Sequence, residues 1–139
     1  MESAPRRRWK LIAALVLVVA LYWLAMFVAT HVPIRPTPEV DPYSLDKLEH
    51  LAAFAALAAL LCAVGAACGF RSWKLTAGIV GVVALYGVLD ETTQALVSHR
   101  TPEFLDWIAD VVGTGLGIAL YSLVDPFRVA TCEPRPPAV

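Results

Sequence analysis

The sequence predicts an all-α fold, an integral membrane bundle of four transmembrane helices that forms a single domain. Hydrophobic residues make up 58% of the 139-residue chain, and the mean hydropathy is +0.65. Soluble domains are usually about 45–50% apolar. Four stretches each approach the roughly 20 apolar residues that a helix needs to cross the hydrocarbon core. The connections between them are too short to hold a separate soluble domain.

The first apolar stretch, residues 11–30, contains no charged residue and follows a basic segment, residues 1–10. This order is also typical of a signal peptide, whose apolar region is usually about 7–15 residues long. The present stretch is longer, and the nearest small-residue site, around Ala29 near its end, is a poor match to a cleavage site. We therefore expect the stretch to be retained as a membrane helix.

The other three apolar stretches are residues 48–68, 75–97 and 104–124. The connections between the four stretches are residues 31–45, 69–72 and 98–103. Prolines in the first connection cannot continue a helix and favour an extended backbone, which predicts a stiff strap across the bundle. We expect a basic N-terminus over residues 1–10, the membrane domain over residues 11–124, and a proline-containing tail over residues 125–139.

The distribution of positive charge predicts the orientation in the membrane. Of the 11 Lys and Arg residues, eight lie before the first stretch, between the second and third, or after the fourth. The remaining three, Arg35, Lys47 and Arg100, fall on the opposite side. Because positive loops stay in the cytoplasm, both termini are predicted to be cytoplasmic.

Several functional classes lack support in the composition. The net charge of −1 supplies no basic field for nucleic acid. The three cysteines form no CxxC pair, and the chain has neither an HExxH motif nor an arginine-rich phosphatase signature. His50 is the only well-placed histidine, so zinc would need an unusual set of one histidine with carboxylates. We expect no metal and no cofactor.

Ionisable residues gather where the second and fourth stretches begin and where the third ends. Because successive helices run in opposite directions, these segments lie at one depth, on the predicted outer side. A carboxylate at the centre of a membrane helix costs about 2.5–3.5 kcal/mol, so these groups should face the interior of the bundle. The predicted polar pocket consists of Asp46, Lys47, His50, Asp90, Glu91, Gln94, Arg100, Asp106 and Asp110.

Helical spacing places several of these residues on shared faces. Asp46 and His50 are four residues apart, as are Asp106 and Asp110. The second pair continues into Gly113 and Gly117, a spacing that lets a neighbouring helix backbone approach closely. The predicted helix-packing residues are Gly113 and Gly117.

Arg100 has a planar fork of donors, and we expect it to bridge Glu91 and Asp106 or to hold an anionic group of a ligand. Simpler roles are open for single residues. Asp46 could cap a helix, and Lys47 could extend to the headgroups. The residues expected at a solvated rim are Asp41, Glu49, His99 and Glu103.

These motifs, in this order, resemble the VanZ-like family of bacterial membrane proteins over about residues 40–120. The matching residues are Asp46-Lys47-x-x-His50-x-x-x-Phe54, Leu89-Asp90-Glu91-x-x-Gln94, Arg100, Leu105-Asp106-Trp107 and Gly113-x-x-x-Gly117. Two positions depart from the family pattern. Asp110 stands where the family usually has Asn, which adds an acid, and His99 stands where a glycine is common, which affects the hairpin.

The resemblance implies a protein of the bacterial cytoplasmic membrane. The family's namesake is associated with low-level resistance to teicoplanin, a glycopeptide that binds cell-wall precursors, but the resemblance supplies no molecular mechanism. The partners expected are membrane lipids or a lipid-linked envelope precursor, and a membrane protein partner or a second copy of the chain is also open.

Three functions are therefore compatible with the sequence. The first is a non-enzymatic module that binds or translocates an amphipathic cell-envelope molecule. The second is a small intramembrane hydrolase or phosphatase that uses His50, Glu91 and Asp106 as catalytic groups. The third is a structural accessory subunit, in which the polar residues only lock the helices together.

Overall fold

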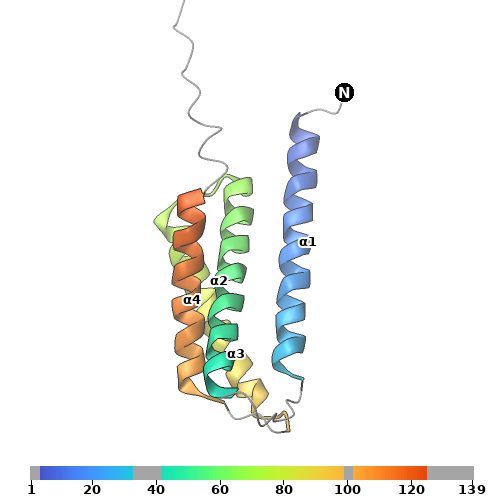
Figure 1. Cartoon of the computed structure of the whole chain (residues 1–139). Coiled ribbons are helices and arrows are strands. Elements are labelled where there is room, and N and C mark those ends of the chain that lie inside the picture. Colours follow the sequence, from blue (N-terminus) through green and yellow to red (C-terminus); the bar gives the residue numbers. More distant parts are fainter. Residues whose placement is uncertain (1–3, 33–41, 99–101, 125–139) are drawn as a thin grey trace, which may run out of the picture.

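The computed structural model describes residues 4–32, 42–98 and 102–124, with the side chains of residues 42–44 left undescribed. Four helices make up the described chain: α1 (Ala4–Thr30), α2 (Pro42–Cys68), α3 (Trp73–Gln94) and α4 (Phe104–Val124) (Figure 1). Each is long and apolar enough to cross a membrane, and no strand occurs among the described residues. The predicted all-α class with four membrane helices is confirmed.

The helix ends differ modestly from the predicted apolar stretches. α1 begins at Ala4, inside the basic segment, because arginine and lysine are good helix formers. α2 begins at Pro42, since proline is well accommodated in the first turn of a helix. α3 ends at Gln94 rather than at Val97, and α4 has the predicted bounds.

The connection between α2 and α3 is a tight turn with a defined stop and start. Gly69 has a φ of 88°, a left-handed conformation that suits glycine. The N–H of Phe70 donates to the carbonyl of Gly65 at 2.8 Å, which is the pattern of a glycine-terminated helix. The hydroxyl of Ser72 then accepts from the N–H of Leu75 at 3.4 Å and caps the start of α3.

α2 and α4 lie side by side and share the most extensive helix contact of the bundle, whereas α1 runs along α2 at the edge (Figure 1). α1 and α3 end, and α2 and α4 begin, at one end of the bundle, which we call the polar end. The N-terminal end of α1 and the C-terminal end of α4 both lie at the other end. The described helices therefore run alternately up and down.

Glycines on α4 bring it against the backbone of α2. A Cβ added to Gly113 would collide with the carbonyl of Leu51, and one added to Gly117 would collide with the carbonyl of Ala55. No other residue fits at such close approach. The two glycines lie one turn apart, so the contact extends along the helix away from the polar end.

Polar and apolar side chains are distributed opposite to those of a soluble protein. Large apolar side chains such as Leu17, Leu85 and Leu123 are exposed, while a small apolar core surrounds Leu57 and Val83. The buried polar side chains are His50, Asp90, Glu91, Gln94, Asp106, Asp110 and Thr114. An apolar exterior around buried ionisable groups is the arrangement expected in lipid.

Candidate functional site

Seven ionisable residues form a connected group at the polar end of the bundle, and we call this group the polar cluster. Its members come from the start of α2, the end of α3, the residue preceding α4 and the first turns of α4. They are Asp46, Lys47, His50, Glu91, Glu103, Asp106 and Asp110. Six of these were predicted for the pocket, and Glu103 is the addition.

His50 and Asp110 form the buried pair of the polar cluster. The Nδ1 of His50 lies 2.8 Å from Oδ1 of Asp110, with side-chain exposures of 4% and 0%. A Cβ added to Gly87 on α3 would lie 2.7 Å from Oδ2 of Asp110, so the missing side chain makes room for this carboxylate. That oxygen is buried and accepts no hydrogen bond from a described residue.

Lys47 is held between two carboxylates. Its ammonium donates to Oε2 of Glu103 at 2.7 Å and lies 3.2 Å from Oδ1 of Asp106. Lys47 is thus part of an ion-pair network, which differs from a simple extension to the headgroups. Asp106 is buried within the first turn of α4.

Glu103 was expected at the solvated rim, and its partly exposed side chain also takes part in the polar cluster. Its half-buried carboxylate pairs with Lys47, and its backbone N–H donates to Oε2 of Glu91 at 2.9 Å. It therefore links α2 to α3 at the entrance to α4. The sequence feature that could have indicated this role is its position three residues before Asp106, which is about one helical turn away.

Asp90 belongs to a separate hydrogen-bonded group on the α1 side. It accepts from Oγ1 of Thr30 at 3.0 Å, from Nε2 of Gln94 at 2.8 Å and from the hydroxyl of Tyr86 at 3.3 Å. We call these four residues the Asp90 network. Neighbouring residues on a helix point about 100° apart, so Asp90 faces α1 while Glu91 faces the polar cluster. The predicted single pocket is therefore divided in two.

His31, just after α1, extends the Asp90 network. Its Nδ1 lies 3.9 Å from Oδ1 of Asp90, and its Nε2 lies 2.9 Å from the hydroxyl of Thr93. Sequence reasoning missed both Thr30 and His31, because the stretch of α1 that leads to them, residues 11–30, contains no charged residue. The only signal was their position at the polar end of that helix.

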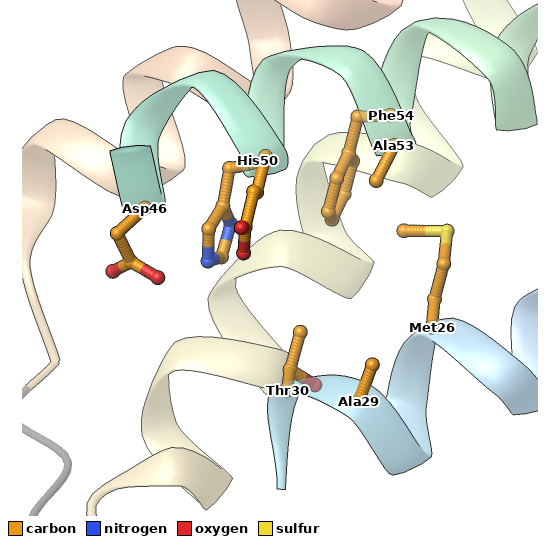
Figure 2. A pocket seen from close by; sticks show the side chains of 8 residues that line it. Met26, Ala29, Thr30, Asp46, His50, Ala53 and Phe54 are labelled. Atoms are coloured by element: carbon orange, nitrogen blue, oxygen red, sulfur yellow. The ribbon is translucent and has the colours of Figure 1, made fainter. Parts of the chain in front are cut away.

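A cavity of about 120 Å³ opens between α1 and α2 beside the polar cluster. Figure 2 shows the carboxylate of Asp46 and the ring of His50 side by side on α2, facing α1. Farther along, the walls become apolar at Phe54 and, from α1, at Met26. The cavity thus combines ionisable and apolar walls.

A second hollow of about 320 Å³ lies between α3 and α4. Its lining is mostly apolar and includes Val88, Phe104 and Trp107, together with Glu91 and Glu103 of the polar cluster. The polar cluster therefore borders a hollow at each of two helix boundaries.

Arg100, together with the rim residues Asp41 and His99, lies outside the described residues. Among those described, one potential ligand atom from each of Asp46, His50 and Asp106 lies within 4.8 Å of the other two. This set could hold a metal ion, although the sequence predicts none.

Comparison with known proteins gives a family assignment. A family model described as VanZ/LLP1 matches residues 5–125 of the chain. No curated protein and no solved structure gives a match. The matched range includes the polar cluster, the Asp90 network and all four helices except the first residue of α1. The chain belongs to the VanZ/LLP1 family.

Proposed function

We propose that this membrane protein binds an amphipathic cell-envelope molecule, either a lipid or a lipid-linked precursor, at its polar end. The observation that supports the proposal is the cavity between α1 and α2. Its wall on α2 changes from Asp46, Glu49 and His50 to Ala53 and Phe54 within about two helical turns. A headgroup would meet the ionisable part, and an acyl or isoprenoid chain would follow the apolar part.

The charge distribution supports a location for this binding. The excess of Lys and Arg at the opposite end of the bundle favours a polar end on the outer face of the bacterial cytoplasmic membrane. Both hollows lie at boundaries between helices, so a lipid of the outer leaflet would enter sideways. Translocation would begin with capture of its headgroup.

Lipid binding by the purified chain in detergent micelles tests the proposal, with undecaprenyl phosphate and phosphatidylglycerol as separate probes. Ala29 lines the cavity, so Ala29→Trp should fill it and weaken binding by about tenfold, the equivalent of about 1.4 kcal/mol. Ala20→Trp, on the same helix but outside the cavity lining, is the matched control and should bind normally. Equal binding by both variants, or no binding of either probe, would contradict the proposal.

A second candidate function is hydrolysis of a lipid pyrophosphate. The hydrogen bond from His50 to Asp110 favours it, because a general base is commonly oriented by such a partner. Release of phosphate from undecaprenyl pyrophosphate is the measurement. His50→Ala should abolish turnover, whereas Asp90→Asn, in the separate network, should retain it.

A cellular assay addresses the link to glycopeptides. In a susceptible bacterial host, expression of the chain should lower sensitivity to teicoplanin, and Ala29→Trp should remove this effect. A purely structural accessory role predicts another pattern, in which Glu91→Gln lowers thermal stability strongly but leaves lipid binding unchanged.

A further inference from the structure

We infer that Asp46, His50 and Asp106 form a binding site for one divalent transition-metal ion. Asp46 and His50 share a face of α2, and Asp106 approaches from the first turn of α4, with one potential ligand atom of each within 4.8 Å of the others. Ligands at about 2.0–2.2 Å from an ion lie roughly 3–4 Å from one another. A side-chain movement of about 1 Å therefore suffices to close the set, and half-buried Asp46 has room to make it.

The orientation of His50 is an independent observation that points to a metal ligand. Its Nδ1 is engaged by Oδ1 of buried Asp110 at 2.8 Å, which leaves Nε2 as the nitrogen that can bind an ion. Metal-binding histidines nearly always hydrogen-bond through the other ring nitrogen, often to a carboxylate, which fixes the ring and raises its basicity. Asp110 occupies that supporting position.

The charges of the polar cluster also favour a bound cation. Its described members bring together five carboxyl groups and a single ammonium, that of Lys47. Buried carboxylates are stable when they are paired or coordinate a metal. Lys47 is shared between Glu103 and Asp106, and a carboxylate that pairs with Lys47 through one oxygen can still bind an ion through the other.

The ligand types indicate which ions fit. One imidazole with two carboxylates suits Zn²⁺, Mn²⁺, Fe²⁺ or Co²⁺ better than Ca²⁺ or Mg²⁺, which prefer oxygen ligands alone. Three protein ligands leave a coordination position open. Asp46 and His50 also line the cavity between α1 and α2, so the open position can accept a phosphate oxygen of a headgroup. This last step rests on the proposed function, whereas metal binding does not.

Titration of the full chain with Co²⁺ alone, without added lipid, tests the site. The protein should be purified in detergent with a histidine-free tag, and absorbance bands of bound Co²⁺ together with calorimetry give the affinity. One equivalent of Co²⁺ should bind. His50→Ala and Asp46→Asn should each weaken binding by about 100-fold or more, and Asp110→Ala by about 10–100-fold.

Two matched controls separate loss of a ligand from loss of structure. Glu49→Gln removes an acid that lines the same cavity, and Asp90→Asn alters a buried carboxylate of the neighbouring network. Both should bind Co²⁺ like the unmodified chain. If His50→Ala fails to fold, Asp46→Asn still tests the site, because Asp46 is only half-buried and its replacement should disturb the fold less. Absence of Co²⁺ and Mn²⁺ binding, or undiminished binding by Asp46→Asn, would overturn the site without bearing on lipid binding.

Discussion

At the scale of single residues, His50 depends on Asp110 for one of its two ring nitrogens. Both side chains are nearly inaccessible, and the two atoms that meet are 2.8 Å apart. A buried polar group that loses its partner costs about 1–3 kcal/mol. The contact is therefore a stability determinant as well as a support for the ring.

Two substitutions of Asp110 test how much this contact with His50 contributes to stability. Asp110→Ala leaves Nδ1 of His50 unpaired and should lower the free energy of unfolding by about 1–3 kcal/mol. Asp110→Asn keeps an acceptor oxygen and should lose clearly less. The unfolding midpoint in mixed detergent micelles measures both. In a His50→Phe background, Asp110→Ala should cost less, and an equal loss in the two backgrounds would exclude the coupling.

At the scale of the helices, α4 has its site residues and its packing residues on one stripe. Asp106 and Asp110 face the polar cluster, and Gly113 and Gly117 face α2. The close approach of the α2 backbone at Gly117 sets the distance between the helices from which His50 and Asp110 extend. The packing of α4 against α2 at the glycines therefore controls the distances between side chains in the polar cluster.

Addition of one methyl group to a glycine of α4 tests the close contact between α4 and α2. Gly117→Ala would collide with the carbonyl of Ala55 and should destabilise the fold by about 1–3 kcal/mol, as overpacking does. Gly115→Ala has no neighbouring atom within 4 Å and should be neutral or gain up to about 1 kcal/mol from helix propensity. Thermal unfolding in detergent compares the two, and equal melting temperatures would contradict the predicted close contact.

The alternating helices place the polar end of the bundle opposite the end at which α1 begins and α4 ends (Figure 1). Most of the Lys and Arg residues lie near the start of α1, around the connection between α2 and α3 or after α4, and so belong to the end opposite the polar end. Because positive loops are retained in the cytoplasm, this asymmetry predicts that the polar end faces outward.

Reporter fusions in a bacterial host test the orientation. Green fluorescent protein fused after Val139 should fluoresce, because it folds in the cytoplasm. Alkaline phosphatase fused after Ser98, at the polar end, should be active, because it needs an oxidising compartment. The same phosphatase fused after Phe70 is the matched control and should be inactive. The reverse pattern would place the polar end in the cytoplasm.

The sequence alone was sufficient to predict the four membrane helices, their order and the end at which the ionisable residues gather. The physical reason is that lipid permits few solutions: an apolar stretch of about 20 residues must satisfy its backbone as a helix. Short connections then force successive helices to alternate. The same pattern of motifs was sufficient to identify the VanZ/LLP1 family.

Which polar residues meet depends on how the helices pack against one another, and this had to be seen in the structure. Asp90 and Glu91 are neighbours in the sequence, but they point in different directions from α3, so Asp90 lies in the Asp90 network and Glu91 in the polar cluster. The packing of α1 brings Thr30 to Asp90. The convergence of Asp46 and His50 with Asp106 likewise depends on how closely α2 and α4 approach. These distances follow from side-chain packing between helices, which the periodicity of a single helix does not contain.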